Sequence, residues 1–223
     1  MSTYHSKKAK EFLKDPKKVE RHDRTFWSLR QKRDAAAAEL PEWEDLREHA
    51  SRIKEHTATH LADYLEQFSN SLERNGVIVH FAKDAQEFNE MVYGILESHK
   101  VKKLVKSKSM LTEECEMNPY LIKRGINVVE SDLGERILQL MHLKPAHIVM
   151  PAIHLTRDEI GEMFEEKGIS KEKGNHDPAY LTRCAREDLR GDFMDADAGL
   201  TGCNFGVAAT GDCVVCTNEG NAD

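Results

Sequence analysis

The stretch Leu104-Val105-Lys106-Ser107-Lys108-Ser109 passes from apolar to polar residues, and Ile126-Asn127-Val128-Val129-Glu130-Ser131-Asp132 repeats this pattern further along the chain. Short apolar runs rich in β-branched residues are typical of buried strands. The segment between them is predicted to be helical, with Thr112 as its N-cap. A strand, helix and strand in succession need a crossover connection, which gives a mostly parallel sheet covered by helices on both faces. The sequence therefore predicts an α/β fold.

The same alternation extends in both directions from this stretch. Residues 77–79 and 148–150 are predicted as two further buried strands. Helices are expected over residues 84–98, after the capping box that begins at Thr156, and after Asp177-Pro178. Near the end, residues 204–208 and 213–216 flank a Thr210-Gly211-Asp212 turn, which indicates a β-hairpin.

The first third of the chain has a different pattern. Residues 1–41 are predicted as a basic helical arm, which ends at Pro41 because proline disfavours helical geometry in the preceding residue. Apolar residues at three- and four-residue steps predict one long amphipathic helix over residues 42–75. The α/β domain is then expected over residues 76–223.

Composition limits the classes of function. No apolar run is long enough for a membrane span and the start lacks a signal peptide, so a cytoplasmic protein is expected. The five cysteines are expected to be reduced thiols. The net charge is −7. Nucleic acid is therefore not expected as the main partner. The basic arm could still touch RNA, lipid or an acidic protein, or could simply be a solvated helix.

The loops that follow the two central strands supply the first candidate site residues. Lys106, Ser107, Lys108 and Ser109 lie between a strand and a helix, where ammonium, hydroxyl and backbone N–H groups can hold a carboxylate or phosphate. The alternative is an ordinary solvated loop.

Carboxylates follow the second strand. Glu130, Asp132 and Glu135 could serve acid–base or cation-binding roles, with Glu130 as a candidate catalytic residue. Asp132 and Glu135 would also stabilise a helix N-terminus without any further function. His154, beyond residues 148–150, could bind a ligand or could be only a hydrogen-bonded spacer.

The Gly-rich segment from Gly199 to Gly211 supplies the remaining candidates. Glycines permit close approach of the backbone to a ligand, or equally to a neighbouring strand. Hydrogen-bonding side chains flank its turns, namely Asn204, Thr210, Glu219 and Asn221. Of these, Asn204, Thr210 and Asn221 are candidate ligand-binding residues, and Glu219 is a candidate catalytic residue.

No metal site is predicted. His49, His56 and His60 share a helical face, but the H-E-x-x-H glutamate and an evident third ligand are missing. Cys213 and Cys216 form a C-x-x-C, yet on a strand residues three apart point to opposite faces. Packing is the expected role of both cysteines.

Several of these stretches together resemble one family, the lactate utilization proteins that share the LUD domain, and in particular their B branch. The resemblance rests on Ile53-Lys54-Glu55-His56-Thr57, Val105-Lys106-Ser107-Lys108-Ser109-Met110, Val129-Glu130-Ser131-Asp132-Leu133-Gly134-Glu135, His147-Ile148-Val149-Met150-Pro151-Ala152-Ile153-His154, and the Gly-rich hairpin. They occur in order across most of the chain.

The resemblance implies a fold like that of ribose-5-phosphate isomerase, glucosamine-6-phosphate isomerase and the CoA transferases. It implies a part in the multi-protein oxidation of L-lactate to pyruvate, with sister lactate-utilization subunits as partners. The B branch carries two four-iron clusters in its C-terminal half. No C-x-x-C-x-x-C-x-x-x-C-P run occurs here, so no cofactor is expected in this chain. The family's domain would also continue past Asn221, so a truncated domain is expected.

The resemblance leaves the catalytic role undecided. Related CoA transferases carry a nucleophilic glutamate on a short turn, and Glu219-Gly220-Asn221 occupies a comparable place, which is an analogy only. The leading hypothesis is a subunit of the lactate-oxidising electron-transfer system that binds a small organic anion or a partner protein. The alternatives are an enzyme or binding domain for a phosphorylated or CoA-linked metabolite, and a non-catalytic assembly domain.

Overall fold

The computed structural model describes residues 3–217 and 219–222. The chain forms two compact units, Met1–Tyr64 and Leu65–Asp223. The division falls inside helix α4, which spans Leu61–Arg74. Each unit is described separately below.

The first unit is helical, with α1 over Thr3–Phe12, α2 over Pro16–Ala38 and α3 over Trp43–Thr59. Asp15 caps α2, because its side chain accepts hydrogen bonds from the backbone N–H groups of Lys17 and Lys18. Pro16 occupies the first helical position, where a backbone N–H would have no partner within the helix, so the missing N–H of proline costs nothing there. Neither α2 nor α3 contains a buried residue.

The single long helix predicted over residues 42–75 is instead two helices, α3 and α4, which are interrupted at His60. Thr57 and Thr59 donate their hydroxyl protons to the carbonyls of Ile53 and Glu55, each four residues back. Such bonds compete with the backbone ladder and bend helices. The apolar spacing is continuous across this point, so it could not reveal the interruption.

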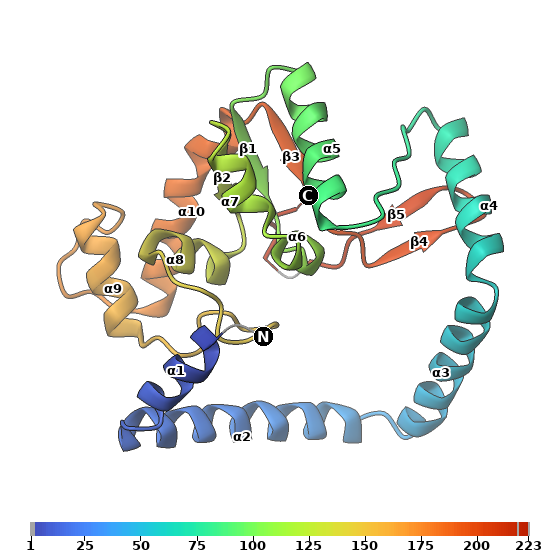
Figure 1. The fold of residues 1–223 in the computed structure, drawn as a ribbon. Coiled ribbons are helices and arrows are strands. Elements are labelled where there is room, and N and C mark those ends of the chain that lie inside the picture. The colour runs from blue at the N-terminus through green and yellow to red at the C-terminus, as the bar shows by residue number, and fades with distance from the viewer. Residues whose placement is uncertain (1–2, 218, 223) are drawn as a thin grey trace. The chain divides into compact units, whose positions relative to one another are not determined.

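In the second unit, a three-stranded parallel sheet has the order β2-β1-β3 (Figure 1). Strand β1, Lys103–Lys106, lies between β2, Asn127–Glu130, and β3, Ala198–Leu200. Lys106 is the register partner of both Glu130 and Leu200. The predicted α/β fold with a parallel sheet is confirmed, and both central strands lie where the apolar runs placed them. Strand β3 was not predicted, because it is short and contains Gly199.

Helices cover both faces of this sheet, and Figure 1 shows α5 and α10 on opposite sides of it. Leu104 and Val128 pack on one face with residues of α5 (Ala85–Ser98) and α7 (Met117–Ile122). Val105 and Val129 face the other way, toward Leu189 of α10 (Pro178–Met194). The side chains alternate between faces because successive residues of a strand point in opposite directions.

Three further helices complete this unit. They are α6 over Met110–Glu114, α8 over Leu133–Met141 and α9 over Arg157–Glu166. Helices α9 and α10 have the predicted caps at Thr156 and Asp177. The cap of α6 is Ser109, whereas the predicted Thr112 lies inside the helix and donates its hydroxyl proton to the Ser109 carbonyl.

Residues 77–79 and 148–150 do not form the strands predicted for them. Ile78 is 78% exposed, so its apolar run is not buried in a sheet. At the second site, Nδ1 of His147 accepts from the backbone N–H groups of Val149 and Met150, which curls the segment into bends. Apolar composition alone does not supply the neighbouring strand that a backbone needs for pairing.

The predicted hairpin is confirmed. Strand β4, Phe205–Val207, pairs antiparallel with β5, Asp212–Val214. The turn lies against α4, where the Ser71 hydroxyl donates to the Ala208 carbonyl at 2.9 Å. Gly211 has a φ of +79°, and a Cβ there would lie 2.8 Å from the Ser71 carbonyl carbon. The glycine is therefore needed both for its backbone conformation and for space.

Across the described residues, no helix is both long enough and apolar enough to cross a membrane.

Candidate functional site

The three parallel strands end in a row of hydroxyl groups. Ser107, Ser131 and Thr201 each come directly after the last residue of β1, β2 and β3. Because Lys106, Glu130 and Leu200 are register partners, the three following residues also lie side by side. We call Ser107, Ser131 and Thr201 the hydroxyl row. It occupies the carboxyl edge of the sheet, where open parallel sheets usually bind ligands.

Hydrogen bonds fix the hydroxyl row. Ser107 donates its hydroxyl proton to Oγ1 of Thr201 at 2.8 Å. The backbone N–H of Ser107 donates to the Leu200 carbonyl at 2.9 Å, and that of Ser131 to the Lys106 carbonyl at 2.8 Å. These bonds continue the sheet ladder by one residue, so the hydroxyls are held on a rigid base.

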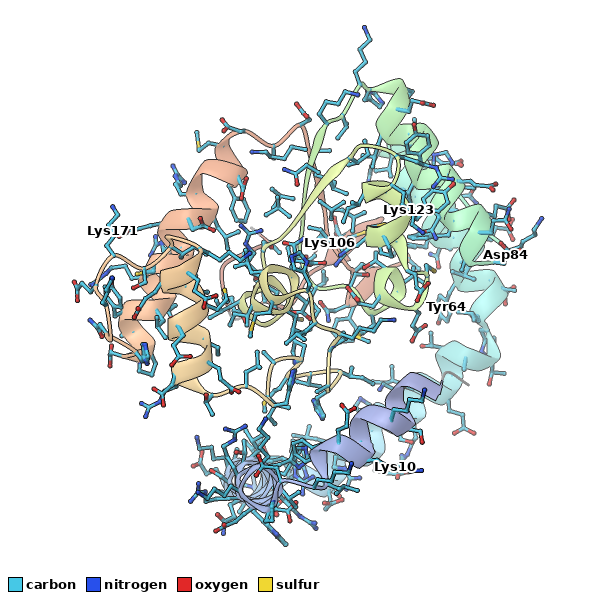
Figure 2. The ribbon with its side chains drawn as sticks, turned by 60° about the vertical axis from the view of Figure 1, so that its left-hand side comes forward. Lys10, Tyr64, Asp84, Lys106, Lys123 and Lys171 are labelled. Atoms are coloured by element: carbon cyan, nitrogen blue, oxygen red, sulfur yellow. The ribbon has the colours of Figure 1, made fainter. Side chains whose placement is uncertain are left out.

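A buried ion pair lies immediately below the row. The side chain of Lys106 is 0% exposed, and its ammonium group donates to both oxygens of Glu130, at 2.9 and 3.0 Å. Asn118 of α7 also donates to Glu130, and Glu113 of α6 lies 3.6 Å from the ammonium group. Figure 2 shows Lys106 in the interior of the Leu65–Asp223 unit.

Burial determines what this pair can do. Desolvation raises the pKa of Glu130 above its ordinary value, and the adjacent Lys106 ammonium group opposes that rise. Buried charges that are paired and hydrogen-bonded resist rearrangement, because separation would leave an uncompensated charge. The pair therefore supports the edge from below, and it does not itself offer a free cation to a ligand.

Lys108 is the accessible cation of this edge, with a side chain 28% exposed. Its ammonium group lies 3.1 Å from a carboxylate oxygen of Glu135 and 3.8 Å from one of Asp132, and it donates to the Val149 carbonyl at 3.2 Å. Burial, and then the neighbouring Asp132, raise the pKa of Glu135 to about 8. With that pKa, Glu135 is mainly protonated at neutral pH and adds little negative charge beside Lys108.

The last described residues reach the same edge. The Ser131 hydroxyl donates to the Asn221 carbonyl at 3.0 Å, and the Asn221 amide lies 3.2 Å from the same hydroxyl. Oε2 of Glu219 accepts from the backbone N–H of Leu133 at 3.1 Å, at the start of α8, where Asp132 is the N-cap. The structure therefore brings two predicted residues, Glu219 and Asn221, next to the hydroxyl row.

Other predicted residues lie elsewhere. Asn204 and Thr210 belong to the hairpin segment, where Oδ1 of Asn204 accepts from the Cys216 N–H and the Thr210 hydroxyl donates to Asp212. Both side chains therefore form hydrogen bonds within the hairpin segment and stabilise the hairpin. Ser109 begins α6 without a side-chain cap bond. His154 lies in the turns between α8 and α9 and is half-buried.

Sequence reasoning missed Thr201 and Asn118 as members of the site. Thr201 could have been found only by recognising β3 and aligning its end with the ends of β1 and β2. Asn118 gave no signal, since a polar residue in a short helix is usually solvated. Its contact with Glu130 depends on how α7 packs on the sheet.

The thiols present do not fit a four-iron cluster. Cys184 is buried in α10, Cys115 is half-buried at the end of α6, and Cys203, Cys213 and Cys216 are exposed near the hairpin. Within residues 3–217 and 219–222, no group of three or more His, Cys, Asp or Glu side chains is arranged to hold a metal ion. Of the predicted histidine face, His56 contacts the Tyr64 hydroxyl through Nε2 at 3.1 Å.

Comparison with known proteins is consistent with this architecture. A family model described as the LUD domain matches residues 65–223. The chain is 47% identical over 196 residues to lactate utilization protein B of Bacillus pumilus, which covers 87% of this chain and 41% of that protein. Lactate utilization protein B of Oceanobacillus iheyensis is also 47% identical, over 87% of this chain and 40% of the relative. The chain thus spans about two fifths of the length of these relatives. No solved structure matches it.

Proposed function

Because the chain belongs to the LUD-domain family, we propose that it acts in lactate utilization, as part of a system that oxidises L-lactate to pyruvate. The support for this pathway is the extensive identity to proteins named lactate utilization protein B. The matches cover 196 residues, more than the family-model region contains, so part of the first unit is shared with these relatives as well.

Within that pathway, the domain binds a small organic carboxylate at the hydroxyl row. The observation that carries this proposal is the placement of Lys108, an accessible cation, beside the carboxyl ends of the three strands. An ammonium group and nearby hydroxyls can form charge-assisted and neutral hydrogen bonds to a carboxylate. The ligand-binding residues proposed from the structure are Ser107, Lys108, Ser131 and Thr201.

The protonation state of Glu135 favours such a ligand. With its pKa raised to about 8, Glu135 is mainly neutral at pH 7 and does not repel an incoming anion. A protonated carboxyl can also donate a hydrogen bond to a ligand oxygen. Lactate and pyruvate each carry a carboxylate next to a second oxygen atom. The Lys108 ammonium group can bind the carboxylate, and the protonated Glu135 carboxyl beside it can donate to the second oxygen.

Thermal-shift measurements on the full chain test this binding role. We expect L-lactate or pyruvate to raise the melting temperature of the wild-type chain, and the Lys108→Gln variant to lose that shift. Lys123→Gln, at an exposed position in the turn after α7, is the matched control and should retain the shift. Equal shifts in both variants would contradict a role for Lys108.

A second candidate is an enzyme or binding domain for a phosphorylated or CoA-linked metabolite. The observation that favours it is the accessible ammonium group of Lys108 beside the hydroxyl row, because an ammonium group binds a phosphate as well as it binds a carboxylate. Sugar phosphates and CoA esters in the same thermal-shift series distinguish this candidate from the first. A shift with these compounds and none with lactate or pyruvate would support it.

Partners and cofactors follow from the family as proposals. Sister lactate-utilization subunits are the proposed partners, and an assembly role without catalysis is the remaining alternative. We also propose that the four-iron clusters of the family bind outside these residues, since the thiols here are unsuitable. Co-purification with the sister subunits, followed by iron analysis of each subunit, tests both points.

A further inference from the structure

The connection between α9 and α10 folds back onto α9. It comprises residues 167–177 and ends at Asp177, the N-cap of α10 (Figure 1). The backbone N–H of Gly174 donates to Oε1 of Glu165, in the last turn of α9, at 2.6 Å. His176, which precedes the cap, also reaches α9, so the same helix holds the connection at two points.

Gly161 provides the space for the imidazole ring of His176. A Cβ at Gly161 would overlap with the ring, so the ring lies directly against the backbone of α9. Asp158, Gly161 and Glu165 are three and four residues apart, which places them along one side of the helix. The ring therefore has one carboxylate on each side of it.

Both ring nitrogens of His176 face a carboxylate. Nδ1 lies 3.0 Å from Oδ1 of Asp158, and Nε2 lies 3.4 Å from Oε1 of Glu165. Nε2 is buried and has no hydrogen-bond partner within the part of the chain that the structure describes. Its nearest acceptor is thus the Glu165 carboxylate, at the distance of an ion pair.

These contacts favour the positively charged ring. A neutral imidazole carries one N–H group and one lone pair, so either tautomer directs a lone pair at a carboxylate. The imidazolium carries two N–H groups and can donate to Asp158 and Glu165 at once. In agreement, the hydrogen bond with Asp158 raises the pKa of His176 above its ordinary value of 6.5, although burial opposes the rise.

The charged groups that face the ring both come from α9, namely Asp158 and Glu165. Among the described residues, the connection and α10 present no charged group to it. Glu172 of the connection accepts from the Asn175 amide at 2.7 Å, and the Asp177 carboxylate caps α10. The protonation state of His176 therefore depends on two carboxylates of a single helix.

We propose that His176 is a pH-dependent latch, whose imidazolium holds the α9–α10 connection against α9 and whose neutral form releases it. Loss of one proton to the solvent replaces an N–H donor by a lone pair that faces a carboxylate, so the connection opens more readily. The latch involves no residue of the hydroxyl row. It goes beyond the proposed lactate function and does not depend on it.

The direction of the pH dependence follows from the raised pKa. The latched ring binds its proton more tightly than the released ring does. The contribution of the latch is therefore complete below about pH 6.5 and is lost as the pH rises through the pKa of the latched ring. Over that interval the opening constant should rise about tenfold for each pH unit that separates the two pKa values.

Two NMR measurements on the labelled full chain test the latch. Proton–nitrogen spectra of the imidazole give the pKa of His176 and show whether both nitrogens carry protons. Amide exchange at Gly174 and Asn175, corrected for the intrinsic exchange rate at each pH, gives the opening constant of the connection. We expect a pKa above 6.5 and an opening constant that rises through the same titration by the predicted ratio.

Three variants separate the latch from general stability. Asp158→Asn should lower the pKa of His176 and shift the rise in opening to lower pH. His176→Gln should remove the pH dependence of opening. His99→Gln, at the exposed C-cap of α5, is the matched control and should leave that dependence intact.

The wild-type measurements decide the matter, whether or not every variant folds. A His176 pKa at or below 6.5, or an opening constant that stays the same through its titration, would overturn the proposal. The same pH dependence of opening in His176→Gln as in the wild type would also overturn it.

Discussion

The ammonium group of Lys106 and the carboxylate of Glu130 face each other across the last register pair of strands β1 and β2, at 2.9 and 3.0 Å. Their backbones belong to the parallel ladder and their side chains form its buried charge pair. The next residues, Ser107 and Ser131, begin the hydroxyl row. The position of the row therefore depends on this pair beneath it.

Breaking the pair should destabilise the domain strongly. We expect Lys106→Met to lower the free energy of unfolding by about 3–5 kcal/mol, because Glu130 would remain as a buried carboxylate without its cation. Urea denaturation of the full chain measures this change. The exposed Lys123→Met is the control and should change stability by less than about 0.5 kcal/mol.

The double variant Lys106→Met/Glu130→Leu separates the charge effect from packing. Replacing both charges by apolar groups of similar size should recover much of the stability, since no unpaired charge is left. A Lys106→Met variant as stable as the wild type, or a double variant less stable than the single one, would show that the Lys106–Glu130 pair does not stabilise the carboxyl edge of the sheet.

Glu135 should titrate near pH 8, well above its ordinary value of 4.5. The folded chain then binds more protons than the unfolded chain between these two values. The contribution of Glu135 to the free energy of unfolding should therefore fall as the pH rises from about 4.5 to 8. Urea midpoints across that range should show a smaller decline in Glu135→Gln than in the wild type.

Asp132→Asn provides an independent check on the cause. Removing the neighbouring negative charge should lower the pKa of Glu135 while burial still holds it above the ordinary value. Carboxyl-carbon NMR of Glu135 reads this directly. A Glu135 pKa that is unchanged in Asp132→Asn would refute the shared origin of the shift.

Gly211→Ala should detach the hairpin from α4. Alanine is strained at a φ of +79°, and its Cβ would meet the backbone of Ser71 and Leu72 at 2.8 and 2.9 Å. We expect a loss of about 1–3 kcal/mol and faster amide exchange in β4 and β5. Gly199→Ala, where nothing lies within 4 Å of a Cβ, should leave both unchanged. Equal effects at the two positions would contradict the steric account.

The central strands and the hairpin could be predicted because their signals are local. The apolar runs before Lys106 and Glu130, and the Thr210-Gly211-Asp212 turn, lie within single elements. Residues 148–150 have the same composition as a strand, but His147 binds their backbone N–H groups instead. Whether a β-branched run finds a partner strand is a tertiary property that composition does not contain.

For the candidate site, the sequence predicted which residues lie at the sheet edge but not what each of them does. Lys106, Lys108 and Glu130 were found because polar residues after buried strands meet at one edge of a parallel sheet. Their different roles were not predictable, since the burial of Lys106 and the access of Lys108 depend on how helices cover the strands. Asn204 and Thr210 were grouped with the site through the Gly-rich pattern, whereas their bonds lie within the hairpin segment.

A titration of the isotopically labelled full chain with L-lactate, followed by backbone amide NMR, tests the central claim most directly. Binding at the hydroxyl row predicts saturable shifts at Ser107, Lys108 and Ser131, with affinity reduced about tenfold or more in Lys108→Gln, as loss of a charge-assisted hydrogen bond implies. Amides at these three residues that do not respond to L-lactate or pyruvate, or that respond identically in Lys108→Gln, would contradict the claim.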